Sequence, residues 1–577
     1  MSRILRINAK DRTYAFEDMG KYAGLGGRAL TSRIVLEEVP PLCHPLSAEN
    51  KLVIATGMLT GTSAANSGRV SVGGKSPLTG TIKEANSGGN FSQKMAKLDI
   101  MGIVIEGKPE KDAPLTAIVL DKDGVKFEDA SGLALSYTYA AAEKLSAKHG
   151  PRSASMLIGP AGETCRLAAS IQFTDPKGRP ARAAGRGGLG ALMGSKRIKA
   201  IVVNDEGAPG VSVADKEAFK KAAKRWVEIL TSHPVTSQGL PGFGTAILVN
   251  VINEAGALPT KNFREGRFEF ASEISGEKMV EIINARGGKA KEGCHPGCVI
   301  QCSQAYHGED GKYLTSGFEY ETVWAFGANS LIKDMDDLAR LDNICDELGL
   351  DTIDMGCAVA VAMDGGRIPW GDGKAALELL KRVGDPNDDL GRIMGNGTAF
   401  VGEAFGVDRV PVVKRQSLPA YDPRAAKGIG VTYATTTMGA DHTAGYAICQ
   451  NMLKVGGDVD PLGKAGQVET SKNLQIATAA VDATGFCLFV AFAVLDTPDA
   501  VQVMCDLIAA KTGAPFTPED FVAMGVNVLK DEIAFNNKAG FTVEDDQLPA
   551  FFSKEALPPH NTVWDFSLEE LQAAKVS

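Results

Sequence analysis

The 577-residue chain has few of the features that would place it in a common structural class. Aromatic residues make up only 6%, and ten cysteines are too sparse for a secreted disulfide scaffold. The longest uncharged apolar run, Ala483 to Leu495, is shorter than the roughly 20 residues that a membrane span needs. The charged N-terminus has no signal-peptide core. These absences predict a cytoplasmic protein without a membrane span, whose cysteines are free for chemistry.

Positive charge is also in deficit. Lys and Arg number 61 against 70 Asp and Glu, a formal charge of −9, which disfavours nucleic acid or an anionic membrane as partner. Glycine, by contrast, reaches 65 residues and exceeds its average usage of about 7%. Because glycine allows tight turns and close backbone approach, this excess predicts a chain that closes around a ligand.

The pattern of apolar residues changes along the chain. The first part has short β-branched runs, including a hairpin pattern over Ala117 to Asp129. Later segments have helical spacing, for example Ser212 to Leu230, with Ser212 as N-cap, and Asp334 to Leu348. A proline-rich stretch, Val410 to Ala425, indicates a further boundary. We therefore expect an α+β fold, with a β-rich domain over 1–208 and two mainly helical domains over 209–415 and 416–577.

Three cysteines form the strongest local motif. Cys294, Cys298 and Cys302 lie in EGCHPGCVIQCSQ, and three thiolates at this spacing suit a soft metal. An iron–sulfur cluster takes a fourth cysteine that often comes from elsewhere in the chain. A zinc site completed by His295 or His307, and buried inert cysteines, are the alternatives. The absence of a second close cysteine pair favours the iron–sulfur interpretation.

A hexamer occurs twice, as DELGLD (Asp346 to Asp351) and DATGFC (Asp482 to Cys487). Helical sequence precedes each copy, which predicts the Asp in the last helical turn and the Gly just beyond, where positive φ is favourable. An Asp opposes the helix dipole there, so it needs a donor-rich partner such as the N–H groups of a pterin. The second copy ends in a candidate fourth cysteine ligand. A plain glycine cap is the alternative for either copy alone.

A glycine-rich stretch runs from Arg182 to Lys196. It contains G-x-G-x-x-G, but the preceding FTDPKGRPARAA is polar and includes proline, whereas a dinucleotide-binding motif follows a buried strand. The remaining interpretation is a backbone cradle, with Arg182, Arg186 and Lys196 available for phosphate. A glycine-rich turn without a ligand is the alternative.

These motifs together resemble the aldehyde:ferredoxin oxidoreductase family over nearly the whole chain, and further matching motifs are KSPLTG (75–80), ANSGG (85–89), IGPAGE (158–163), FEYET (318–322) and GADH (439–442). The resemblance implies a β platform that binds two pterins around tungsten, or less often molybdenum. It implies oxidation of aldehydes to carboxylic acids, possible in both directions. Electrons would leave through a [4Fe–4S] cluster to ferredoxin or to an iron–sulfur or flavin subunit, in a homo- or hetero-oligomer.

The resemblance also assigns roles to residues. The cluster ligands would be Cys294, Cys298, Cys302 and Cys487. Contacts to one pterin and to phosphates, which a magnesium ion can bridge, would come from Arg69, Asn86, Gly88, Arg182, Ala183, Gly185 and Arg186. The paired hexamers would bind one pterin each, through Asp346 and Asp351 and through Asp482 and the neighbouring Leu488.

Two further residues are candidates for proton transfer. Glu321 of FEYET and His442 of GADH have spacings similar to those of the family's active-site acid and histidine. A carboxyl group in a dry pocket has a raised pKa and can accept a proton, and a neutral imidazole can orient a carbonyl oxygen. The ordinary alternatives are a solvated pair with Glu319 and a turn histidine beside Asp441.

The sequence departs from the family pattern in four places. The first cysteine spacer has three residues where two are usual, and Phe486 replaces a leucine. Ala444 stands where a lysine is expected, and the helix over 338–343 lacks the Glu-x-x-His pair that binds a metal between subunits in some members. Two other functions therefore stay open: a related benzoyl-CoA reductase subunit, although no basic cluster for CoA phosphates is evident, and a zinc-stabilised structural subunit.

Overall fold

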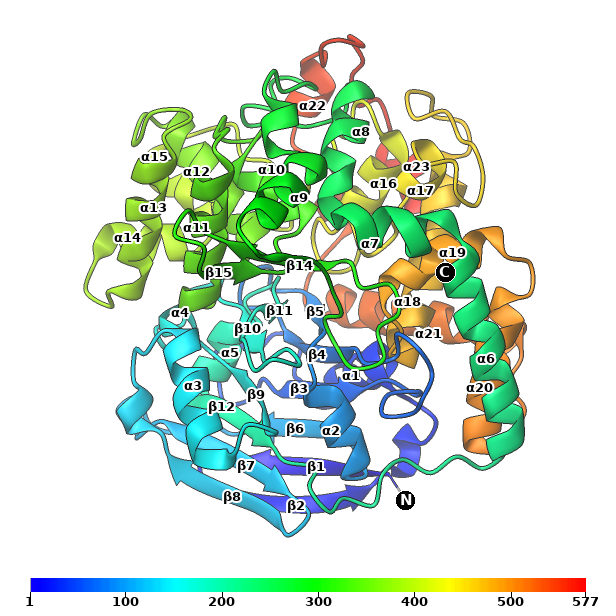
Figure 1. Ribbon diagram of the computed structural model, residues 1–577. Coiled ribbons are helices and arrows are strands. Elements are labelled where there is room, and N and C mark those ends of the chain that lie inside the picture. Colours follow the sequence, from blue (N-terminus) through cyan, green and yellow to red (C-terminus); the bar gives the residue numbers. More distant parts are fainter. Residues whose placement is uncertain (1, 577) are drawn as a thin grey trace.

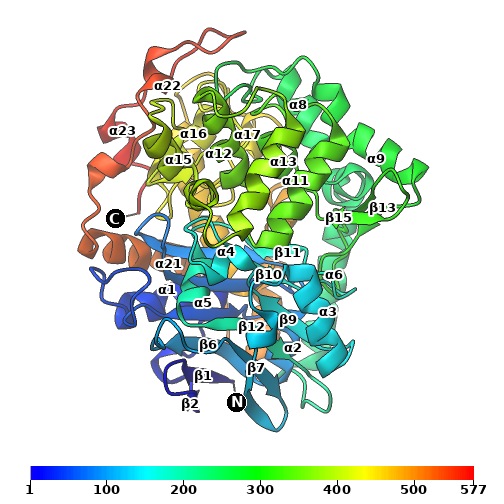
Figure 2. The same ribbon diagram turned by 90° about the vertical axis from the view of Figure 1, so that its left-hand side faces the viewer.

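The computed structural model describes residues 2–576, with two β-sheets at one end of the molecule and most helices at the other (Figure 1, Figure 2). The first sheet has the strand order β2-β1-β6-β3-β4-β5. Strand β1 pairs with β6 in parallel, and the other neighbours are antiparallel. The bounds are β1 (Arg3–Asn8), β2 (Thr13–Asp18), β3 (Leu52–Thr56), β4 (Val70–Lys75), β5 (Ile82–Ser87) and β6 (Ile100–Glu106).

The second sheet has the order β11-β10-β9-β12-β7-β8. Its strands are β7 (Thr116–Asp121), β8 (Gly124–Asp129), β9 (Ala154–Leu157), β10 (Ile171–Phe173), β11 (Arg182–Ala184) and β12 (Ile198–Val203). Strands β7 and β8 are the predicted hairpin. Buried side chains of both sheets, among them Ile54, Val72, Met156 and Ile201, form one apolar cluster. This shared core joins the two sheets into a platform.

Helices dominate after residue 205, which confirms the predicted α+β class. Helix α11 (Met335–Leu348) lies within the predicted helical segment 334–348, and the Asp334 side chain caps its first turn. Helix α6 (Lys216–Ser232) begins later than predicted, because the Asp215 side chain, and not Ser212, accepts the free N–H of Ala218. The other helices that shape the site are α10 (Tyr320–Phe326), α12 (Thr352–Asp364), α16 (Lys427–Thr435), α18 (Gln467–Thr484), α20 (Ala500–Thr512) and α21 (Pro518–Lys538).

The region expected to be helical also holds a small sheet that the sequence did not predict. Its order is β13-β14-β15, with β13 (Lys289–Glu292), β14 (Ser303–His307) and β15 (Tyr313–Ser316). The two predicted helical domains share one apolar cluster, which includes Leu338 and Ile429. Helix α6 packs on α20. The boundary between these domains stays a prediction.

Both hexamers end a helix in the predicted way. Helix α11 ends at Gly349 with φ +71°, and α18 ends at Gly485 with φ +88°. Each helix end rests directly on the backbone of the platform. A Cβ atom on Gly159 would overlap the Leu348 carbonyl, and a Cβ atom on Gly57 would overlap Gly485. Glycine at these positions therefore allows two helix ends to sit against the platform backbone.

Within residues 2–576, no single helix is both long and apolar enough to cross a membrane. One pair of helical segments, Val235–Phe243 and Thr245–Glu254, is long and apolar enough only when the two are taken together, and the direction of the chain changes by 92° between them.

We expect Gly485→Ala to lower the melting temperature much more than Gly406→Ala. Both glycines cap a helix with positive φ, at +88° and +66°, so both substitutions add about 1–2 kcal/mol of backbone strain. Only at Gly485 would the new methyl group also meet Thr60 and Gly57, and such overpacking costs about a further 1–3 kcal/mol. Differential scanning calorimetry measures both shifts. Equal shifts would show that the contact with the platform contributes no stability.

Candidate functional site

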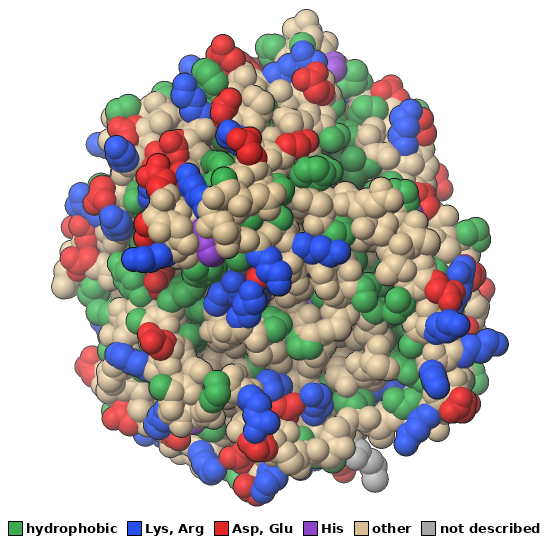
Figure 3. All heavy atoms as spheres, viewed as in Figure 1, with side chains coloured by type: hydrophobic (Ala, Val, Ile, Leu, Met, Phe, Trp, Pro, Cys, Tyr) green, Lys and Arg blue, Asp and Glu red, His purple; other side chains and the backbone are tan. Residues whose placement is uncertain are grey.

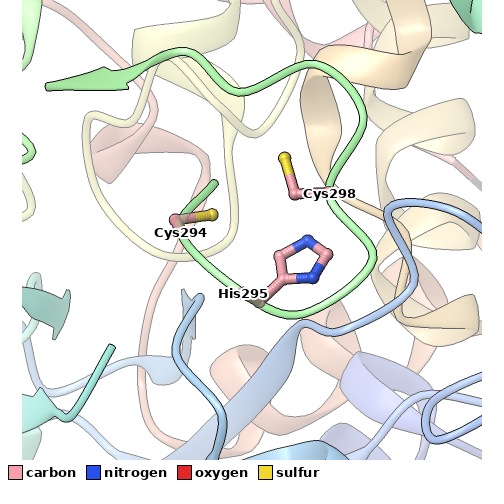
Figure 4. A group of neighbouring side chains, drawn as sticks. All are labelled: Cys294, His295 and Cys298. Atoms are coloured by element: carbon pink, nitrogen blue, oxygen red, sulfur yellow. The ribbon is translucent and has the colours of Figure 1, made fainter. Parts of the chain in front are cut away.

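The four predicted cluster cysteines come from two segments of the chain. Cys294, Cys298 and Cys302 lie in the loop between β13 and β14, and Cys487 follows the end of α18. All four are buried free thiols. In Figure 4 the sulfur atoms of Cys294 and Cys298 lie on the inner side of the loop, and with a ring nitrogen of His295 they lie within 4.8 Å of one another.

The other two thiols interact electrostatically with this group, and a backbone bridge through Asn66 joins the Cys487 segment to the loop. Burial raises the pKa of Cys487 to about 11, with Cys294 adding to the rise against the effect of Arg69. Burial also raises the pKa of Cys302, with Glu319, Cys294 and Cys487 adding to the rise. Four buried thiols close together are the donor set that an iron–sulfur cluster takes. The residues present therefore fit an iron–sulfur cluster.

A zinc ion would find fewer ligands here than an iron–sulfur cluster would. The Nδ1 atom of His295 lies 2.9 Å from the Pro296 carbonyl oxygen, and its Nε2 atom has no hydrogen-bond partner among the described residues. Cys294, His295 and Cys298 thus form a possible three-ligand group. Zinc stays the alternative to a cluster, and metal analysis distinguishes them.

Asn66, which the sequence analysis missed, holds the two cysteine segments together. It is fully buried with φ +62°, a conformation that Asn tolerates better than most residues. Its N–H donates to Gly297 O at 3.1 Å, and its carbonyl accepts the N–H of Cys487 at 2.8 Å. Its Oδ1 accepts the N–H of Val299 at 3.0 Å, and its Nδ2 donates to Cys298 Sγ at 3.4 Å. No sequence motif marks these contacts, because all of them are long-range.

Arg69 lies between the cysteines and the second hexamer. Its Nε donates to Asn86 Oδ1 at 2.5 Å, and its charge acts to lower the pKa of Cys294, Cys487 and Asp482. A Cβ atom on Gly88 would lie 3.1 Å from Cys294 Sγ and 3.2 Å from Arg69 Nη1. The predicted residues Arg69, Asn86 and Gly88 are therefore brought together beside the cysteines.

The predicted phosphate cradle is only partly open. Arg186 donates to Asp351 Oδ2 at 3.2 Å, to the Ala440 carbonyl at 2.7 Å and to the Ser417 carbonyl at 2.7 Å. Lys196 donates to the carbonyls of Asn50 and Gly107. Both cations therefore have protein acceptors in this structure, and their contact with phosphate stays a prediction.

The glycines of this stretch divide into two groups. Cβ atoms on Gly188 and Gly190 would overlap the carbonyls of Leu167 and Ser170, so these glycines serve the packing of α5 (Leu189–Ser195). Gly185 is different, since the nearest atom to its Cβ would be Asp351 Oδ1 at 4.0 Å. Only this end of the stretch, next to β11, has room for a ligand.

Arg182 and Ala183 lie on β11, the edge strand of the second sheet, which contacts β5 of the first. The Arg182 Nη2 donates to Ser303 Oγ at 2.5 Å, while its Nε has no hydrogen-bond partner in the described part of the chain. The Arg182 charge also acts to lower the pKa of Asp346. Arg182 thus lies between the cysteine loop and the first hexamer.

The carboxyl groups of the two hexamers have different partners. Burial, followed by the charge of Asp342, raises the pKa of Asp346 well above its usual value, and its side chain forms no hydrogen bond within residues 2–576. Asp351 caps α12 by accepting the N–H of Ile353. Burial raises the pKa of Asp482 to about 6, against the opposing charge of Arg28, which lies 3.3 Å away. Leu488 is half-buried in the turn after Cys487.

Glu321 and His442 form a buried pair. Glu321 lies in α10 and His442 in the loop after α16, with 3.4 Å between Glu321 Oε1 and His442 Nε2. Burial raises the pKa of Glu321 to about 8, and Glu321 Oε2 accepts the N–H of Ala420 at 2.9 Å. Burial lowers the pKa of His442 to about 4. At neutral pH the pair therefore consists of a protonated carboxyl group and a neutral imidazole.

Asp441, the residue before His442, is ionised, in contrast to Glu321. Asp441 is buried, yet Lys83 and Arg186 lower its pKa far below the usual value, despite the raising effect of burial. Lys83 lies on β5, with its Nζ 3.2 Å from Asp441 Oδ2. This ion pair and the bond from Arg186 to Ala440 fix the loop that carries His442 against the platform.

Aromatic rings gather beside His442, although the chain has few. Tyr421 and Tyr446 lie 6.3 and 6.2 Å from its ring, centroid to centroid, and their hydroxyl groups are 2.6 Å apart. Phe492 lies 6.3 Å from Tyr446, and Phe489 stacks on Phe492. Sequence patterns gave no signal for this ring wall, because its members are spread over 70 residues of chain.

The fold and the site together define a class of metal-dependent oxidoreductase, with converging thiols and a buried acid–imidazole pair on a two-sheet platform. Two family descriptions match the chain: "Aldehyde ferredoxin oxidoreductase, N-terminal domain" over residues 4–205, and "Aldehyde ferredoxin oxidoreductase, domains 2 & 3" over residues 221–573. The chain belongs to the aldehyde ferredoxin oxidoreductase family.

Relatives and a solved structure extend this result. The tungsten-containing aldehyde ferredoxin oxidoreductase of Pyrococcus furiosus is 37% identical, over 96% of this chain and 92% of that protein. The protein of the same name from Thermococcus kodakarensis is 36% identical over the same shares. The active-site complex BamBC of benzoyl coenzyme A reductase matches with a TM-score of 0.80 at 20% identity, covering 99% of this chain and 93% of that one. The last likeness shows the fold alone.

We expect Asn66→Gly to lower the iron content of the purified protein. Wild-type protein should carry about four iron atoms per chain, as a [4Fe–4S] cluster requires. Glycine keeps the positive φ and the two backbone bonds of Asn66 but removes the bonds to Val299 and Cys298 Sγ. Outer-shell losses of this kind cost about 10–100-fold in metal affinity. Iron and acid-labile sulfide are measured, with Asn561→Gly, at an exposed Asn with φ +56°, as control. Undiminished iron in Asn66→Gly would contradict the role, and zinc without iron in the wild type would exclude the cluster.

Proposed function

We propose that this protein is an enzyme that oxidises an aldehyde to a carboxylic acid and passes the electrons through a [4Fe–4S] cluster to a ferredoxin or a partner subunit. The observation that carries the proposal is the group of four buried thiols from two separate segments, beside Arg69, whose backbone N–H donates to the Gly485 carbonyl of the second hexamer. The names of the Pyrococcus and Thermococcus relatives support the tungsten and the aldehyde.

We propose that a bis-pterin with tungsten, or molybdenum, lies between the platform and the two hexamers. When bound, this group takes up the two electrons of the oxidation. The residues fit a polar ligand at this place, because Ser71, Ser87 and the Arg182 Nε are buried polar groups without a protein partner. The proposed contacts are Arg69, Asn86, Gly88, Arg182, Ala183, Gly185, Asp346, Asp351, Asp482 and Leu488, with a magnesium ion at the phosphates.

Arg186 has a different role in this proposal from that expected at first. Its guanidinium group bonds Asp351 on one side and the Ala440 carbonyl on the other. It therefore positions the acid of the first hexamer relative to the loop that carries His442. Asp346, which has no hydrogen-bond partner among the described residues, is the carboxyl group best placed to accept pterin N–H donors.

Glu321 and His442 would divide the proton transfer between them. We propose that the carboxyl proton of Glu321 is directed at His442 Nε2, 3.4 Å from Oε1, which would place the imidazole proton on Nδ1, a buried nitrogen without a hydrogen-bond partner among the described residues. The Nδ1–H group can then hold the aldehyde oxygen. Once ionised, Glu321 can accept a proton from the water that adds to the carbonyl carbon. The buried surroundings keep bulk water from competing.

We expect the rate of aldehyde oxidation to rise with pH through about 8, the raised pKa of Glu321, because the base must be the carboxylate. Glu321→Gln should remove this pH dependence and lower kcat by about 10²–10⁴-fold, with iron and tungsten contents unchanged. The control is Glu403→Gln, an exposed glutamate paired with Arg415. Near-full turnover of Glu321→Gln would exclude Glu321 from the mechanism.

We expect turnover with acetaldehyde and benzaldehyde and none with benzoyl-CoA. The ring wall beside His442 can pack against an aromatic group, so benzaldehyde should give the higher kcat/KM, by about fivefold for one favourable aromatic contact of about 1 kcal/mol. Aldehyde-dependent reduction of benzyl viologen measures the first two, and dienoyl-CoA formation measures the third. Turnover of benzoyl-CoA alone would replace the proposed function by the benzoyl-CoA reductase alternative.

A further inference from the structure

A basic surface lies next to the cysteine loop. Lys289 and Lys291 alternate along β13, and both side chains are exposed. Lys177 and Arg179 lie in the turn between β10 and β11 and contact Glu292 at the end of β13. We call these four cations the β13 patch. Figure 3 shows Lys and Arg side chains gathered in the middle of this face of the molecule.

The charges of the β13 patch are only partly balanced. Arg179 lies 2.6 Å from Asp175 and 2.6 Å from Glu292, and Lys177 also pairs with Glu292. Both acids are buried beneath the basic groups. Lys289 and Lys291 form no ion pair with any of the residues 2–576. The patch therefore presents a local excess of positive charge on a chain whose formal charge is −9.

The β13 patch is continuous with the cluster loop. Strand β13 ends at Glu292, two residues before Cys294. Lys291 and Cys294 are three residues apart, so their Cα atoms are separated by at most about 11 Å. Between Cys294 and Cys298 the loop bends outward at Pro296 and Gly297, and both are exposed. The candidate cluster thus approaches the surface beside the two unpaired lysines.

We propose that the β13 patch is the docking surface for an acidic one-electron carrier protein, steered by Lys289 and Lys291. The inference rests on the proposed function. Conversion of an aldehyde and one water molecule to a carboxylic acid releases two electrons and two protons, so two oxidised carriers must each accept one electron in turn. An acidic protein is repelled by the overall charge of this chain, and a local patch of opposite sign overcomes this at close range.

Two other features of the chain make the proposal testable. Strand β13 is an edge strand of its sheet, and lysines on an edge strand can act simply to prevent pairing with another chain. A second basic surface runs along α6, where Lys216, Lys220, Lys221 and Lys224 are exposed. Charge reversal at either place changes the net charge of the protein equally, which makes α6 a matched control for β13.

The test compares the holoenzyme variants K289E/K291E and K220E/K221E with the wild type, using an acidic [4Fe–4S] ferredoxin as acceptor. We expect K289E/K291E to lower kcat/KM for ferredoxin by about tenfold or more at low salt and to flatten its dependence on ionic strength, since steering of this kind raises association rates by about 10–10³-fold. The kcat with saturating benzyl viologen and the iron content should stay unchanged.

Two results would overturn the proposal. One is an unchanged kcat/KM and salt dependence for ferredoxin in K289E/K291E, which would leave these lysines as edge protection only. The other is a loss confined to K220E/K221E, which would place the carrier on α6. If the proposed function itself is wrong, the wild type will show no aldehyde-dependent reduction of benzyl viologen, which is a different result from either.

Discussion

The site depends on two contacts in which backbone meets backbone without intervening side chains. The end of α11 lies against Gly159, and the end of α18 lies against Gly57. The backbone N–H of Ser170 also donates to the Gly349 carbonyl at 2.9 Å, and the backbone N–H of Arg69 donates to the Gly485 carbonyl at 3.0 Å. Because each hexamer includes one of these helix ends, the contacts set where its acids and the fourth cysteine can lie. The high glycine content thus has a structural cause at the centre of the molecule.

Burial raises the pKa of each acid in the site, and the groups around each acid then decide whether it stays ionised. Asp441 keeps its charge because Lys83 and Arg186 face it, whereas at Glu321 burial outweighs the N–H of Ala420 and the charge of Arg186. Environments that push the pKa values of nearby acids in opposite directions are a common feature of acid–base sites. The ionised Asp441 anchors the loop, and the protonatable Glu321 is left for chemistry.

Short-range signals predicted much of this arrangement, and long-range contacts account for what they missed. The β7–β8 hairpin, the glycine-ended helices and the cysteine triplet depend on residues a few positions apart, so sequence patterns reveal them. Asn66 and the ring wall depend on segments that meet only in the fold, and no local pattern marks them. The bonds of Arg186 and Lys196 were missed for a related reason: sequence shows a cation but not which protein carbonyls accept its donors.

The distribution of positive charge adds a last constraint on electron exit. Several cations are almost fully buried, among them Arg28, Lys83, Lys196, Lys199 and Arg424. More acids than cations are buried, 14 Asp and Glu against 10 Lys and Arg among residues 2–576, so the solvent-facing surface is less acidic than the formal charge of −9 but keeps an excess of acids. On such a surface, exposed unpaired lysines near the candidate cluster affect the approach of an acidic partner more than the same lysines on a neutral protein, because the remaining surface repels it. The deficit of positive charge in the sequence thus makes the position of the remaining cations informative.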